Sequence, residues 1–158
     1  MKIGKISLKN NIKPKILVIA SLFLILLPFF FVTYTPSTDL PQHLSQIYLL
    51  TETIKGNTEL YSINWYAPNN LIYILIAVSS LIFPPVLAGK IVLMIIVLLW
   101  GGSIFFLARK RNRPLANVFL ALIFIYNLSL YWGFLNFLIG WPIFVFWIIH
   151  TSNPLNKK

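Results

Sequence analysis

Long apolar runs separated by short polar segments dominate the sequence. A helix that crosses a bilayer needs about 20 predominantly apolar residues, and four of the five longest runs approach or exceed that length. The fifth, Leu71–Phe83, has prolines close to both ends and would span only about 20 Å. The pattern predicts an all-α, polytopic membrane bundle with four transmembrane helices. These cover residues of about 16–33, 86–108, 115–131 and 133–150.

The only sizeable polar stretch lies between the first two spans, from residue 34 to residue 85. Asp39 followed by Pro41 is a helix-start signal, and Gly56 is placed to end the helix. Apolar residues between them recur at helical spacing on one face, which predicts an amphipathic helix over about 41–55 with its apolar side on the outer membrane surface. A short interfacial or re-entrant helix is expected over 71–83. The apolar face of the predicted amphipathic helix consists of Leu40, Leu44, Ile47, Tyr48 and Ile54.

Composition agrees with a membrane as the solvent of this chain. Of its 158 residues, 58% are hydrophobic and only 10% are charged, against about 25% charged in a typical soluble domain. The net charge of +10 would suggest nucleic acid in a soluble protein. Here the basic residues gather at the ends of the apolar runs, so no nucleic-acid partner is expected. The absence of cysteine excludes disulfides and thiolate chemistry.

The basic residues also predict the topology. If Leu71–Phe83 does not cross, eleven basic residues lie inside and only Lys55 and Lys90 lie outside. If Leu71–Phe83 crosses, six basic residues lie inside and seven lie outside. We therefore expect a multi-pass protein of the cell (inner) membrane with both termini cytoplasmic, residues 151–158 forming a cytoplasmic tail. The basic N-terminus resembles a secretory signal, but no small-x-small cleavage site follows the first run, so an uncleaved span is expected. The eleven are Lys2, Lys5, Lys9, Lys13, Lys15, Arg109, Lys110, Arg111, Arg113, Lys157 and Lys158.

Candidate chemistry is concentrated in the external segment, which holds all three acidic residues, Asp39, Glu52 and Glu59. Asp39 and His43 are four residues apart and approach one helical face. A carboxylate and an imidazole so placed could share a proton, bind a divalent cation or orient a hydroxyl nucleophile. Alternatively, Asp39 only caps the helix and His43 is solvated. Spacing alone leaves both interpretations open.

Three further residues have both a structural and a functional interpretation. Lys90, just inside the outer end of the second span, either snorkels to the headgroups or meets a phosphate near the surface. Tyr66, before Pro68, suits an aromatic interface anchor. Asn136 shares a helical face with Gly133, Phe137 and Gly140, which favours helix packing.

In their order, these features resemble the N-terminal part of GT-C-type membrane glycosyltransferases. The resemblance is carried by Asp39-Leu-Pro-Gln-His43-Leu, Tyr66 to Pro68, Lys90, Arg109 to Arg113 and Gly133-Phe-Leu-Asn136-Phe137. It implies transfer of a sugar from a polyprenyl-phosphate donor on the outer membrane face. Asp39 would be the general base or a metal-linked carboxylate, with His43 beside it and a divalent ion as candidate cofactor. Lys90 would contact the donor phosphate, and Tyr66 and Asn136 would contact substrate.

The chain departs from those enzymes in two respects. They are much longer, with many more spans, and many carry a paired acidic motif where this chain has the single Asp39. Three hypotheses therefore stay open. The chain is a GT-C-like module completed by a partner membrane subunit that supplies further spans, a truncated non-catalytic relative, or an unrelated small accessory or structural membrane subunit.

Overall fold

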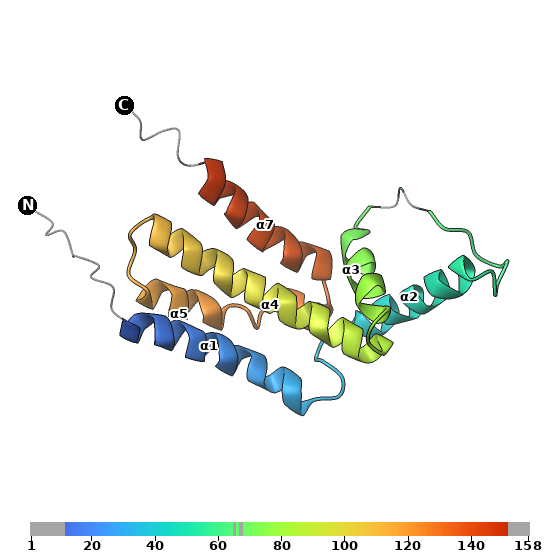
Figure 1. Ribbon diagram of the computed structural model, residues 1–158, viewed down its shortest axis with the longest axis horizontal. Coiled ribbons are helices and arrows are strands. Elements are labelled where there is room, and N and C mark those ends of the chain that lie inside the picture. The colour runs from blue at the N-terminus through green and yellow to red at the C-terminus, as the bar shows by residue number, and fades with distance from the viewer. Residues whose placement is uncertain (1–11, 65, 67, 152–158) are drawn as a thin grey trace, which may run out of the picture.

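The computed structural model describes residues 12–64, 66 and 68–151, and all regular structure in this part of the chain is helical (Figure 1). The all-α class expected from the sequence is confirmed, with no strand among these residues. The helices are α1 (Ile12–Phe31), α2 (Leu40–Ile54), α3 (Leu71–Ser80), α4 (Pro85–Lys110), α5 (Ala116–Ile123), α6 (Leu128–Trp132) and α7 (Leu135–Thr151).

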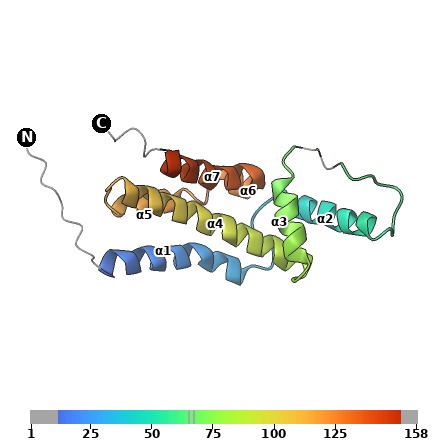
Figure 2. The same cartoon turned by 45° about the horizontal axis from the view of Figure 1, so that its top comes forward.

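Helix α4 is the centre of the molecule. It packs against α1, α5 and α7 along the bundle and against α2 and α3 at its beginning (Figure 2). Gly101 allows the closest approach, because a Cβ there would lie 2.5 Å from a Leu22 methyl and 2.8 Å from a Leu122 methyl. A larger residue would clash with these two leucine side chains, which would have to move to make room for it.

The two ends of the bundle differ in chemistry. The first residues of α1 and the last residues of α4 and α7 lie at one end (Figure 1). We call it the basic end, because Arg109, Lys110, Arg111 and Arg113 are there. Helices α2 and α3 lie at the opposite end with Asp39, which we call the α2–α3 end.

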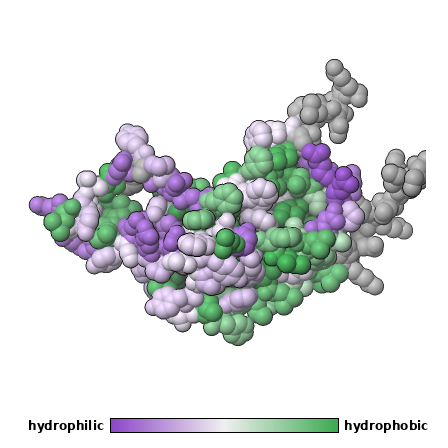
Figure 3. Space-filling model, turned by 180° about the vertical axis from the view of Figure 1, so that it is seen from behind, coloured by the Kyte–Doolittle hydropathy of each residue, from purple (hydrophilic) through white to green (hydrophobic). Residues whose placement is uncertain are grey.

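The exterior of the bundle is largely apolar. Ile19, Phe31 and Phe124 are 67%, 80% and 68% exposed, and Figure 3 shows hydrophobic residues over much of the bundle and a mixture of hydrophilic and hydrophobic ones over the lobe that contains α2. Within the described residues, only α4 is both long and apolar enough to cross a membrane by itself. Exposed apolar surface on this scale is unusual for a soluble protein, and with α4 it points to a membrane.

The expected single helix over 115–131 is interrupted. α5 ends at Ile123, and α6 begins at Leu128 after a turn. Asn127 causes the new start: its backbone is extended, and its side chain accepts a hydrogen bond from the amide of Leu130. Asparagine is among the best N-cap residues, so the break follows from local chemistry inside an apolar run.

Of the packing face expected for the last helix, Asn136 does contact a neighbouring helix, whereas Phe137 and Gly140 do not. Phe137 is 67% exposed, and a Cβ on Gly140 would meet nothing within 4 Å. Gly133 lies before the helix, in the left-handed region with φ +91°, and ends α6. The buried face of α7 instead consists of larger residues, Leu135, Leu138, Ile139, Pro142 and Val145.

Helix α2 runs from Leu40 to Ile54, within one residue of the expected range at each end, and Gly56 follows with φ +73°. The part of its apolar face nearest its start packs on protein, whereas Tyr48 and Ile54 are 59% and 62% exposed. Leu40 and Ile47 are buried, and Leu40 and Leu44 contact Gly89 of α4, where a Cβ would lie 3.2 and 3.0 Å from their methyl groups. Helix α3 ends at Ser80, earlier than the expected Phe83, in a turn that precedes two prolines.

Candidate functional site

Asp39 lies at the start of α2, where the backbone is held by the last two residues of α6. The amide of Asp39 donates to the carbonyl of Trp132 at 3.2 Å, and the amide of Thr38 donates to that of Tyr131 at 2.8 Å. Asp39 occupies the N-cap position, but its side chain makes no capping hydrogen bond. The carboxylate is therefore not committed to the helix end, as a purely capping role would require.

Gly133 permits this close approach. Its φ of +91° is a conformation that favours glycine, and a Cβ there would lie 2.8 Å from the Cβ of Asp39 and 3.0 Å from its amide nitrogen. Any side chain at this position would displace Asp39 from the turn. The glycine therefore sets the position of the carboxylate.

His43 lies one helical turn after Asp39 and joins α2 to two other elements. Its Nδ1 is 3.0 Å from the Tyr73 hydroxyl on α3, and its Nε2 is 3.3 Å from the carbonyl oxygen of Gly133. The two rings also meet edge to face, with centroids 5.2 Å apart. A carbonyl can only accept, so in the neutral imidazole Nε2 carries the proton and Nδ1 accepts from the tyrosine hydroxyl.

Tyr73 and Asp39 interact electrostatically. Burial raises the pKa of the Tyr73 phenol above its usual value, and the negative charge of Asp39 raises that pKa further. Both effects keep the phenol protonated, as its donation to His43 requires. His43 and Tyr73 are joined by a hydrogen bond, and Asp39 acts on Tyr73 through its charge without a side-chain hydrogen bond to either. We call these three groups the acid–imidazole–phenol cluster.

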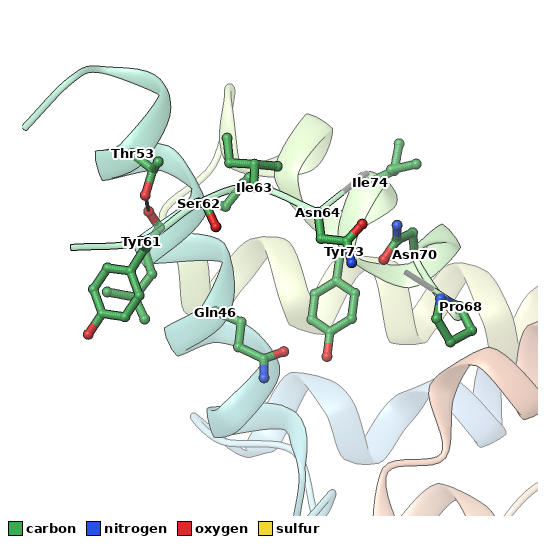
Figure 4. Close-up of a pocket in the computed structure, with 12 residues that line it drawn as sticks. Gln46, Thr53, Tyr61, Ser62, Ile63, Asn64, Pro68, Asn70, Tyr73 and Ile74 are labelled. Carbon is green, nitrogen blue, oxygen red and sulfur yellow. Dashed lines mark hydrogen bonds between the residues drawn. The ribbon is translucent and has the colours of Figure 1, made fainter. Parts of the chain in front are cut away.

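One member of the cluster, Tyr73, lines a cavity of about 560 Å³ between α2, the loop that follows it and α3, and Asp39 and His43 are not among the described lining residues. Figure 4 shows Gln46 and Tyr73 extending from the two helices toward this space. No charged side chain is present among the described lining residues, which combine amides, hydroxyls and aromatic rings with aliphatic groups. Such a lining suits a neutral ligand with several hydroxyl groups and an apolar face. The polar lining side chains include Gln46, Tyr61, Ser62, Asn64, Asn70 and Tyr73.

Lys90 is not part of this cluster. Its Nζ donates to the carbonyl of Val32, the residue directly after α1, so it ties the end of α1 to the start of α4. It borders a separate hollow formed with Phe31, Thr33 and Leu87. The side chain is partly buried, and its ammonium is engaged by backbone.

Tyr66 and Asn136 also lie apart from the carboxylate. Tyr66 is 98% exposed, and its amide donates to the side chain of Asn64. Asn136 accepts a hydrogen bond from the amide of Ile72 at 3.2 Å and so satisfies a free amide in the first turn of α3. In this structure Asn136 positions α3, and with it Tyr73.

Sequence reasoning did not single out Tyr73. The available signal was only that a tyrosine follows Asn70 in a short apolar helix, which is typical of an interface residue. For a metal ion, Asp39 and His43 supply two candidate ligands, and among the described residues no group of three or more His, Asp or Glu comes together. Both His43 nitrogens already have partners. These residues fit proton transfer better than metal binding.

Comparison with known proteins leaves the interpretation to the site itself. No protein-family model, curated protein or solved structure matches the chain. Within the described residues, the fold is all-helical and has one helix long and apolar enough to cross a membrane. The acid–imidazole–phenol cluster and the adjoining cavity are the features on which a function can be argued.

Proposed function

We propose that the chain is a multi-pass membrane module, similar to GT-C glycosyltransferases, that takes part in transferring a sugar from a polyprenyl-phosphate donor at the outer membrane face. One observation carries the proposal. The Asp39 carboxylate, free of capping bonds, lies close enough to Tyr73 to act on it by its charge, and Tyr73, which is hydrogen-bonded to His43, lines a cavity of mixed polar and apolar character at the end of the bundle opposite the basic turn. A neutral polyhydroxy ligand is what that lining suits.

The arrangement of the helices supports four spans. At 1.5 Å per residue, α4 is about 39 Å long, α1 about 30 Å and α7 about 26 Å, close to the thickness of the hydrocarbon core. Helices α5 and α6 together cover the remaining span. The start of α1 and the ends of α4 and α7 share the basic end, so that end would be cytoplasmic, with both termini beside it. The α2–α3 end, with Asp39, would be external.

The chemistry assigned to the cluster is general base catalysis. Asp39 accepts the proton of an acceptor hydroxyl, whose oxygen bonds to the anomeric carbon of the donor sugar while the bond from that carbon to the phosphate oxygen breaks. His43, fixed by Tyr73 and Gly133, keeps the start of α2 in register with the turn before α7. Polyprenyl phosphate leaves. Lys90 could contact its phosphate only by giving up the Val32 carbonyl, and a partner membrane subunit would supply the remaining donor site.

A second candidate is a structural or accessory membrane subunit. It is favoured by the way polar side chains bond to the backbone of neighbouring helices, as Asn136 does to Ile72 and Lys110 to the Ile149 carbonyl. Such bonds position helices and need no substrate. The proton-accepting role of Asp39 is what separates the two candidates.

The substitution Asp39→Asn tests the proposal. Asparagine keeps the size of the side chain but accepts no proton at neutral pH, so turnover of polyprenyl-linked sugar should fall about 100-fold or more. The assay uses membranes that contain the chain with its partner subunit, and immunoblotting shows equal abundance. Glu59→Gln serves as the matched control. It likewise replaces a carboxylate by an amide, but at an exposed position after α2, and it should retain full turnover. Normal turnover by Asp39→Asn would leave the accessory role.

A further inference from the structure

A second hollow lies at the basic end, far from the acid–imidazole–phenol cluster. It has a volume of about 450 Å³ and lies at the end of α4, beside the start of α5 and the last turns of α7. Its lining has two parts. Arg111, Arg113 and Asn117 supply polar groups, and Ile104, Leu107 and Ile148 supply an apolar wall.

The turn after α4 fixes the positions of the two arginines. Asn112 has φ +50°, its amide donates to the carbonyl of Arg109, and the amide of Arg113 donates to that of Ala108 at 2.8 Å. This pair of bonds around a left-handed residue is the Schellman arrangement that ends helices. Arg111 and Arg113 therefore flank one tightly held residue, and both line the hollow.

No acidic side chain among the described residues neutralises these arginines. The chain contains three acidic residues in all, and each lies in the segment between α1 and α3 at the opposite end. The neighbouring basic residues are used differently. Lys110 donates to the Ile149 carbonyl, and Arg109 lies over the ring of Phe105 at 5.8 Å from its centroid. Neither of them lines the hollow.

We propose that this hollow binds the phosphate headgroup of an anionic phospholipid, with an acyl chain along Ile104, Leu107 and Ile148. Guanidinium groups form paired hydrogen bonds with phosphate oxygens, and basic pockets between membrane helices hold anionic headgroups. Inorganic phosphate shares the headgroup chemistry but has nothing to place on the apolar wall. The proposal depends on the chain lying in a membrane and is independent of sugar transfer.

Native mass spectrometry of the full chain in mild detergent tests this site. Titration with phosphatidylglycerol should give a 1:1 adduct at a lower lipid concentration than phosphatidylcholine with the same acyl chains. Arg111→Gln and Arg113→Gln should each weaken the phosphatidylglycerol adduct about fivefold. Arg109→Gln removes the same charge at the same end but from outside the hollow, and should leave the adduct unchanged. Circular dichroism of each variant checks that it remains folded.

Three results would overturn the proposal. Equal binding of the two lipids would show that the headgroup charge is not recognised. An equal loss in Arg109→Gln would mean that diffuse positive charge, and not the hollow, attracts the lipid. Displacement of the lipid by an equal concentration of inorganic phosphate would assign the hollow to free phosphate. Because no sugar substrate enters the assay, failure of the sugar-transfer proposal would not change these readings.

Discussion

At the scale of single residues, the spacing of four between Asp39 and His43 does not determine the role of the Asp39 carboxylate. Its distance from His43 along the chain allows either a helix cap or a shared proton. The structure gives the carboxylate no capping bond and turns His43 away toward Tyr73 and Gly133. Asp39 acts on Tyr73 through the negative charge of its carboxylate, which raises the pKa of the phenol.

Replacement of Tyr73 by phenylalanine should change the stability of the protein at alkaline pH. Burial, and then the charge of Asp39, raise the pKa of Tyr73 above its value of 10.0 in an unfolded chain. The folded protein therefore holds this proton more tightly than the unfolded chain does. The resulting stabilisation is complete below pH 10 and is lost as the pH rises through the higher folded-state pKa. In Tyr73→Phe this loss should be absent.

The measurement is the thermal unfolding midpoint of the detergent-solubilised protein from about pH 9 to about pH 11. The midpoint of the wild type should fall more steeply than that of Tyr73→Phe. Tyr48→Phe, at an exposed position on α2, controls for the general effect of losing a tyrosine. Identical slopes for the wild type and Tyr73→Phe would remove Tyr73 from the cluster.

Gly133 and Gly140 form a natural pair for substitution by alanine. At Gly133 the new methyl group would meet Asp39 at 2.8 Å in a backbone conformation with φ +91°, so the free energy of unfolding should fall by about 1–3 kcal/mol. At Gly140, within α7, nothing lies within 4 Å, and alanine should raise it by up to about 1 kcal/mol. Denaturant titration of both variants checks the difference. A neutral Gly133→Ala would contradict the close packing of Asp39 on the turn.

At the scale of elements, the sequence predicted what local chemistry controls. The start of α2 before Pro41 and its end before Gly56 follow from residues with fixed backbone preferences. The break between α5 and α6 carries a local signal too, in Asn127, but it is embedded in a run whose apolar length suggested one continuous span. Hydrophobicity reports burial in lipid or in protein alike and does not show where a helix is interrupted.

The contacts between elements could not be predicted in the same way. His43 meets Tyr73 and Gly133, which lie 30 and 90 residues further along the chain, so no local pattern connects them. The apolar face of α2 was clear from its periodicity, but its partner was not. Gly89 on α4 accepts Leu40 and Leu44, which sequence reasoning had assigned to the membrane surface. A glycine in an apolar helix shows that close packing is feasible without showing which helix approaches.

At the scale of the whole molecule, both proposals start from the difference in charge between the two ends of the bundle. Four basic residues lie at one end around the turn after α4, and the acid–imidazole–phenol cluster lies at the other. The bundle between them has an apolar exterior. A bilayer around the bundle would separate a lipid-binding basic end in the cytoplasm from a sugar-binding end outside. The sugar-transfer proposal requires this separation, whereas the lipid-site proposal requires only that the bundle lies in a membrane.

Cysteine labelling in intact cells tests that separation most directly, because the chain contains no cysteine and each variant has a single thiol. Leu60→Cys lies in the segment after α2, where the residue is 87% exposed, and Pro114→Cys lies in the exposed turn between α4 and α5. Neither change alters a charge. A membrane-impermeant maleimide should label Leu60→Cys in intact cells, and Pro114→Cys only after the membrane is permeabilised. Labelling of Pro114→Cys in intact cells would put the basic turn outside and contradict the account.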